Sequence, residues 1–258
     1  MQDRASLSKK ILTPLPSVDF DPTEAAVPWK ILKDHGFTVV FSTPAGQVAT
    51  ADQKMVSGKG LGIWARLLKA DAKGLSAYNE MRVSPEFLHP LPWSEIRCGD
   101  FAGIVLPGGH APGMKEYLES SFLQKTIADF FEEQKLVGAI CHGVVLAARS
   151  QSPRGQSVLW GRQTTALLKS QELSAWALTG LWMRNYYRTY PETVQSEVTR
   201  HLAQKNDFFN GPWPLQRDSL AHLRRGFVLQ DGNYISARWP GDAHAFGLKL
   251  AQFLLKGS

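Results

Sequence analysis

The stretch LVGAICHGVVLAARS, residues 136–150, runs from an apolar, strand-like segment into a short helical one and places Cys141 at the junction. A sharp turn from strand to helix presents its apex side chain at the carboxyl edge of a sheet, where open α/β folds bind ligands. Gly143 lets the helix pack closely against the strand, as the small residues of a nucleophile elbow do. The stretch therefore predicts a functional elbow in an α/β fold.

Strand-like and helix-like segments alternate on both sides of this elbow. The predicted strands cover residues 9–17, 37–46, 101–109 and 136–143, and the helices between them cover 23–36 and 114–135. A hairpin turning at Asp231-Gly232 and a final helix at 241–256, capped by Asp242, complete the pattern. Such alternation is typical of a doubly wound, mostly parallel sheet with helices on both faces.

Length and composition indicate an ordinary globular protein. The chain has 258 residues, 43% of them hydrophobic and 20% charged, and we expect residues 1–258 to form one domain. The net charge is +6, but Lys and Arg are scattered, so no nucleic-acid partner is predicted. Apolar runs fall short of the ~18 residues that a spanning helix needs, and the first ten residues lack a signal-peptide core. We expect a cytoplasmic protein without membrane contact.

One segment departs from a plain doubly wound sheet. Residues 173–203 carry two Trp and three Tyr in a predicted helix-loop-helix, and we place a helical insertion at about 174–215. Its aromatic side chains suit extra core, a dimer contact, or a wall over a pocket. Under the last interpretation, Trp176 and Trp182 would shape the pocket.

The two cysteines differ in their surroundings. Cys141 precedes a helix N-terminus and His142, which lower the pKa of a thiol and favour the reactive thiolate. A buried apolar cysteine without chemistry is the alternative. Cys98 has no base nearby in the sequence, and we interpret it as a packing residue.

Four motifs, in order along the chain, carry a resemblance to a known family. They are DPTEAAVPW (21–29), VLPGGHAPGM (105–114), AICHG (139–143) and ISARWPGDAHAF (235–246). Together they resemble the ThiJ/PfpI superfamily, and most closely its heat-shock chaperone and glyoxalase branch. The resemblance implies a flavodoxin-like fold related to class I glutamine amidotransferases, and a homodimer.

The resemblance also implies catalytic roles. Cys141 matches the nucleophile, His142 the adjacent base, and Glu24 the carboxyl group that approaches the thiol. A carboxylate beside a thiolate is repulsive unless it is protonated, so Glu24 is expected to have a raised pKa. The stretch GRQTTALLKSQE resembles one that ends in an orienting acid, which would be Glu172, with Asp242 as the alternative.

A second group of residues is predicted to bind the substrate. Gly108 and Gly109 end a strand, and the Gly109 amide, with that of His142, would form an oxyanion site. His110 would line the same pocket. No metal-ligand spacing is recognisable, so neither a metal nor another cofactor is predicted.

The resemblance, together with these residues, implies a glyoxalase that needs no cofactor. Cys141 would add to methylglyoxal or a similar 2-oxoaldehyde, and the product would be a 2-hydroxy acid; repair of glycated protein is a variant. The same residues suit a cysteine amidase or peptidase acting on an amide substrate. A third alternative is not an enzyme, but a redox sensor at Cys141 or a holdase chaperone.

Overall fold

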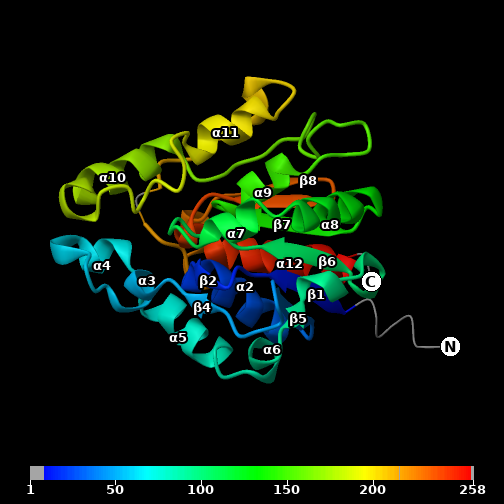
Figure 1. Ribbon diagram of the computed structural model, residues 1–258, viewed down its shortest axis with the longest axis horizontal. Helices are drawn as coiled ribbons and strands as arrows, with labels where there is room; N and C mark the ends of the chain where they lie inside the picture. The colour runs from blue at the N-terminus through cyan, green and yellow to red at the C-terminus, as the bar shows by residue number, and fades with distance from the viewer. Residues whose placement is uncertain (1–8, 215, 257–258) are drawn as a thin grey trace.

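The computed structural model describes residues 9–214 and 216–256, and its centre is a seven-stranded sheet (Figure 1). The strand order is β5-β3-β1-β6-β7-β9-β8; β8 runs antiparallel to β9, and the other neighbours are parallel. The bounds are β1 Lys10–Pro14, β3 Thr38–Thr43, β5 Leu91–Pro92, β6 Gly103–Leu106, β7 Leu136–Ile140, β8 Val228–Asp231 and β9 Tyr234–Ala237. The mostly parallel α/β fold is thereby confirmed.

Helices cover both faces of this sheet. Helix α2 (Pro22–Asp34) joins β1 to β3, which precedes β1 in the strand order of the sheet. Helix α8 (Ser121–Glu132) joins β6 to β7, and these two strands follow β1 in that order. Right-handed crossovers that run in opposite directions place their helices on opposite faces. Helix α12 (Ala243–Lys256) packs beside α2, and α9 (Gly143–Arg149) packs beside α8. The strand order reverses between β1 and β6, where open α/β sheets bind ligands.

Two stretches differ from the predicted elements. The predicted helix at 114–135 is two helices, α7 (Met114–Leu118) and α8, because the Ser120 side chain caps a new helix by accepting from the Leu123 N–H. Residues 47–100, to which the sequence assigned no elements, hold short ones. They are β4 (Thr50–Ala51), which pairs with β2 (Val18–Phe20), and α3 (Gln53–Ser57), α4 (Ala65–Leu68), α5 (Ala72–Met81), α6 (Pro85–Leu88) and β5. Most are too short to show a clear periodicity.

The cap of the last helix comes from elsewhere in the chain. Asp242 precedes α12, but its carboxylate accepts from the N–H groups of Phe227 and Arg238 and pairs with the Arg238 guanidinium. Asp218 instead accepts from the N–H groups of His244 and Ala245. The capping prediction for Asp242 was wrong, since its oxygens hold a buried ion pair.

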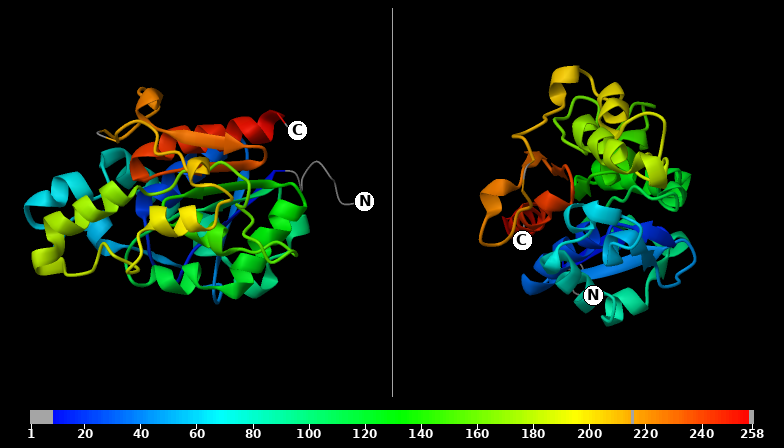
Figure 2. Two further views of the ribbon diagram at one scale, coloured as in Figure 1. Left: turned by 90° about the horizontal axis from the view of Figure 1, so that it is seen from above. Right: turned by 90° about the vertical axis from the view of Figure 1, so that its left-hand side faces the viewer.

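The aromatic insertion contains α10 (Lys169–Met183) and α11 (Val194–Arg200). Helix α10 extends toward α4 (Figures 1 and 2), and Trp182 Nε1 donates to the Gly60 carbonyl at 2.9 Å. A small apolar cluster joins the two regions around Met55, Leu61 and Tyr187. Across residues 9–214 and 216–256, no helix combines the length and apolarity needed to cross a membrane.

Candidate active site

The elbow at Cys141 is the sharp turn that its sequence predicts, and its backbone is strained. Cys141 follows β7 with a φ of 58°, a left-handed conformation that costs a non-glycine residue roughly 1–3 kcal/mol. A Cβ at position 143 would lie 2.1 Å from the Leu106 carbonyl oxygen, so only glycine allows α9 to approach β6 this closely. The elbow thus holds the Cys141 side chain at the carboxyl end of the sheet.

Glu24 and Gly108 meet Cys141 from two other elements. Glu24 lies in the first turn of α2, is fully buried, and accepts from the Gly108 N–H through Oε2 at 2.8 Å. A Cβ on Gly108 would lie 2.6 Å from that oxygen and 2.9 Å from the Cys141 Cβ. Glu24 Oε1 has no hydrogen-bond partner among the described residues. The carboxyl group therefore retains a free oxygen beside the thiol.

His142 is held in one tautomer by a residue that the sequence did not indicate. Its Nδ1 lies 3.5 Å from Cys141 Sγ, and its Nε2 lies 3.2 Å from Thr189 Oγ1. The Thr189 hydroxyl donates its one proton to the His110 carbonyl at 2.7 Å, so it accepts from His142 Nε2–H. Burial lowers the pKa of His142 to about 3 and keeps the ring neutral. The unprotonated Nδ1 then faces the thiol as a proton acceptor.

Glu172 does not make the predicted contact with His142. It is 3% exposed, its Oε2 accepts from the Val194 N–H at 2.9 Å, and its Oε1 lies 3.3 Å from Arg188 Nε. Burial raises its pKa to about 7. Arg188 directly precedes Thr189 in the chain. The ion pair between Glu172 and Arg188 therefore helps to hold the segment in which Thr189 contacts His142. The alternative acid, Asp242, is occupied by Arg238.

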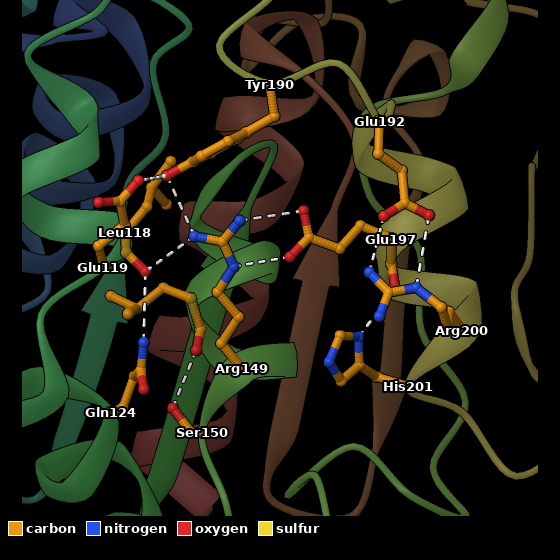
Figure 3. Close-up of polar contacts among 11 residues, drawn as sticks. Leu118, Glu119, Gln124, Arg149, Ser150, Tyr190, Glu192, Glu197, Arg200 and His201 are labelled. Atoms are coloured by element: carbon orange, nitrogen blue, oxygen red, sulfur yellow. Dashed lines mark hydrogen bonds and ion pairs between the residues drawn. The ribbon is translucent and has the colours of Figure 1, made fainter.

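The same segment is tied to the helix that follows the nucleophile (Figure 3). Arg149, in the last turn of α9, donates to both oxygens of Glu197 in α11, at 2.6 and 3.1 Å. Its Nη1 donates to the Tyr190 hydroxyl at 3.1 Å, and that hydroxyl donates to Glu119 at 2.8 Å. Arg149 thereby connects the elbow helix to the loop next to Thr189.

Protonation of the thiol differs from the sequence-based expectation. Burial raises the pKa of Cys141, and the nearby Glu24 and Asp21 carboxylates raise it further. Burial also raises the pKa of Glu24 well above its usual value, as predicted. The prediction that the pKa of Cys141 is lowered was wrong. The backbone N–H of His142 favours the ionised sulfur, but burial and the two carboxylates raise the pKa by more than this N–H lowers it. Sulfur and carboxyl therefore act as one coupled pair.

The predicted oxyanion residues border the same site. Gly109 has a φ of 156°, and a Cβ there would meet the Asp19 carbonyl oxygen at 2.7 Å. Its N–H makes none of the backbone hydrogen bonds found among the described residues, so it is free for a ligand. The His110 ring stacks on Tyr187 with centroids 4.3 Å apart, and burial lowers its pKa to about 3.

A cavity of about 280 Å³ opens over these residues. Helix α10 and the Trp213-Pro214 segment form much of its wall, so the insertion covers the pocket. Trp213 and Trp239 line the cavity, whereas Trp176 and Trp182 do not. The expectation for those two was wrong because Trp182 turns to Gly60 and the Trp176 ring lies under the Arg188 guanidinium, which is 6.0 Å from the ring centroid. The lining residues are Asp21, Glu24, Met55, Leu67, Leu68, Gly109, His110, Cys141, Leu167, Ser170, Gln171, Glu172, Ser174, Ala175, Leu178, Tyr187, Trp213, Pro214, Arg217, Trp239 and Pro240.

Cys98 lies outside this cavity and is partly exposed. Burial raises its pKa to about 12, although Lys135 nearby opposes the shift. No histidine pairs with it among the described residues, in contrast to Cys141. A packing role for Cys98, rather than a catalytic one, agrees with these surroundings.

Replacing Thr189 by valine tests the tautomer argument. Thr189→Val removes the acceptor from His142 Nε2–H, and we expect kcat to fall about 3- to 10-fold, the effect of one ordinary hydrogen bond. KM should change little, because the Thr189 side chain is not part of the cavity wall. Thr189→Ser keeps the hydroxyl and should restore kcat. A Ser variant as slow as the Val variant would contradict the orienting role.

Comparisons with known proteins agree with this architecture. The chain is 26% identical to a glutathione-independent glyoxalase of Schizosaccharomyces pombe over 58% of this chain and 60% of that protein. It spans between 45% and 64% of the length of the curated relatives it matches. Candida albicans glyoxalase III superimposes with a TM-score of 0.66 at 15% identity, covering 95% of this chain and 97% of the other.

A second solved structure and a family model extend the match. The Francisella tularensis Rapid Encystment Protein of 24 kDa gives a TM-score of 0.70 at 15% identity, over 95% of this chain and 99% of that one. At such identities the likeness shows the fold. The model of the ThiJ/PfpI-like family matches residues 15–212, well over half of the chain. Fold, elbow and family model agree, and the chain belongs to the ThiJ/PfpI-like family.

Proposed function

We propose that the protein is a cysteine-dependent glyoxalase that converts 2-oxoaldehydes to 2-hydroxy acids without glutathione. One observation carries the proposal: the unprotonated Nδ1 of a neutral His142 and the free oxygen of a carboxyl with a raised pKa both lie beside a cavity-facing thiol. At rest His142 is thus in the state that can accept a proton, and Glu24 is in the state that can donate one. The glyoxalase relatives support the same reaction class.

The first step forms a hemithioacetal. Cys141 Sγ attacks the aldehyde carbon, the S–H proton passes to His142 Nδ1, and the carbonyl π electrons move to oxygen. The Gly109 N–H stabilises the developing oxyanion, which then takes a proton from the Glu24 carboxyl. Glu24 is left as a buried carboxylate with a high affinity for protons.

The second step moves hydrogen between two substrate carbons. The Glu24 carboxylate removes the proton from the former aldehyde carbon, and the ketone oxygen takes the proton that His142 received in the first step, which gives an enediol and a neutral His142. The Glu24 carboxyl then gives its proton to the second carbon and takes the hydroxyl proton from the first, which leaves a thioester on Cys141 and a protonated Glu24. One carbon is oxidised and its neighbour is reduced, so the step needs no external oxidant or reductant.

Hydrolysis releases the product. Water, deprotonated by His142, attacks the thioester carbon, the C–S bond breaks, and the sulfur regains its proton. The 2-hydroxy acid leaves through the cavity. With methylglyoxal the product is lactate.

The test is a lactate assay on the purified protein. Methylglyoxal is supplied without glutathione and in the presence of a chelator, and both loss of aldehyde and formation of lactate are followed. We expect equal amounts of each, over many turnovers. Loss of aldehyde without lactate would contradict the proposal.

The unpaired Gly109 N–H also favours a second candidate, a cysteine amidase, because an oxyanion donor serves any carbonyl attacked by the thiol. Release of ammonia or amine from a panel of small amides, with no lactate from methylglyoxal, would favour this candidate. The apolar cover over the thiol suits small substrates in either case.

A further inference from the structure

One side chain of the cavity wall has an unused hydrogen-bonding group. Arg217 donates through Nη2 to the Lys69 carbonyl at 3.1 Å, and its guanidinium lies 5.4 Å from the Trp239 ring centroid. Its other terminal nitrogen, Nη1, is buried and has no hydrogen-bond partner within the described chain. The guanidinium is thus held by the Lys69 carbonyl and the Trp239 ring, and its Nη1 has no partner among the described residues.

The charge of Arg217 is not neutralised by an ion pair. None of the ion pairs among residues 9–214 and 216–256 includes it. At longer range its charge lowers the pKa values of Asp21 and Glu24. Burial has the larger and opposite effect on both, and it raises the pKa of Asp21 to about 6. Asp21 already accepts from the N–H groups of Thr23 and Glu24.

Arg217 is also the one cation among the described cavity residues. The part of the wall that the structure describes contains no lysine and no other arginine, and His110 is neutral because burial lowers its pKa. Two further donors of the same wall, Trp239 Nε1 and the Tyr187 hydroxyl, are buried and unpartnered in the described structure. Buried donors without acceptors destabilise a fold unless a ligand completes them.

We propose that Arg217 binds a carboxylate at the far end of the substrate, so that the preferred substrates are 2-oxoaldehydes whose carbon chain ends in a carboxylate. The planar guanidinium offers directed donors that match carboxylate oxygens, and the apolar Leu67 and Leu178 suit the methylene groups between the two ends. The product is then a 2-hydroxy acid with a second carboxylate. This inference rests on the proposed glyoxalase function.

The first test compares one acid with its ester. Wild-type protein is assayed with 4,5-dioxopentanoate and with its neutral methyl ester. We expect kcat/KM for the acid to exceed that for the ester by about tenfold or more, as for one charged hydrogen bond. In Arg217→Met this ratio should fall to about one. In Arg217→Lys the ratio should be intermediate, because lysine keeps the positive charge but lacks the paired N–H donors of the planar guanidinium. Arg224→Met removes an exposed arginine and should keep the wild-type ratio.

The second test does not need turnover. Glutarate, a dicarboxylate, is used to protect Cys141 from iodoacetamide, with the labelled cysteine located by mass spectrometry. Protection in the wild type and in Arg224→Met, but not in Arg217→Met, supports the carboxylate site. Thermal melting and circular dichroism establish that each variant is folded, and Arg217→Lys serves if the Met variant is not.

The outcomes separate the two claims. Turnover of methylglyoxal with an acid-to-ester ratio near one in the wild type overturns the carboxylate site and leaves the glyoxalase standing. No turnover of any aldehyde, with protection by glutarate that depends on Arg217, overturns the glyoxalase and leaves the carboxylate site standing. Equal protection in the wild type and Arg217→Met overturns the carboxylate site.

Discussion

Cys141→Ala should abolish lactate formation, with a loss of at least ~10⁴-fold in kcat, because no other described residue of the cavity wall carries a thiol that could form the thioester. The protein should remain folded, since alanine removes only one buried sulfur atom and leaves a small cavity. Alanine keeps the same positive φ, so any change in melting temperature should be small.

The matched control is Cys98→Ala, which removes the other thiol. It should keep wild-type kcat and KM, because Cys98 lies outside the cavity. Residual lactate formation by Cys141→Ala at more than a small fraction of the wild-type rate would place the nucleophile elsewhere.

Glu24→Gln should lower kcat by ~10²-fold or more, the usual contribution of a general acid or base. Gln can still accept the Gly108 N–H, so the fold is retained, but it can neither protonate the hemithioacetal oxyanion nor remove the carbon-bound proton. The measurement is methylglyoxal turnover by folded variants. Glu132→Gln, at an exposed position, is the control and should be as active as wild type.

The Glu24 variant should also change how stability depends on pH. Burial raises the folded-state pKa of Glu24 above its unfolded value near 4.5, so the stability it contributes is present below 4.5 and is lost as pH rises through the raised value. Glu24→Gln lacks this loss and should be relatively more stable than wild type at alkaline pH. Wild-type activity in a folded Glu24→Gln protein would show that Glu24 has no catalytic role and only favours the N-terminus of α2.

Local sequence signals were sufficient for the elbow, whereas Glu24 was identified through the family resemblance. A strand leading into Cys141, with Gly143 behind it, predicts a turn whose geometry depends on neighbouring residues. Glu24 matches a family motif, and the structure places it in the first turn of α2. Both features depend on contacts within a few residues or on the strand order of the sheet. The structure accordingly agrees with these predictions.

Other residues could not be placed from local patterns. Thr189 reaches His142 only because the insertion is held by Arg149 and by the pair of Glu172 and Arg188, contacts between segments far apart in the chain. Glu172 ends the stretch that resembles the family's orienting acid, but its oxygens are taken by Arg188 and the Val194 N–H. A motif match predicts the region in which an acid lies and does not fix its partner.

Arg217 had no sequence signal for the same reason. It lies just before Asp218, in an irregular segment whose course is set when Asp218 caps α12. The surrounding residues show neither helical nor strand periodicity, so nothing local directs the guanidinium toward the cavity. Tertiary packing alone brings Arg217 and Cys141 to the same wall.

The central claim is that Cys141 is a catalyst and is regenerated, rather than modified once. The most direct test counts lactate molecules formed per protein chain while intact-mass spectrometry follows the chain itself, with methylglyoxal in large excess and no glutathione. We expect many lactate molecules per chain, and a chain that returns to its unmodified mass when the aldehyde is consumed. A single stable adduct on Cys141 with less than one lactate per chain would contradict the claim and indicate a sensor thiol.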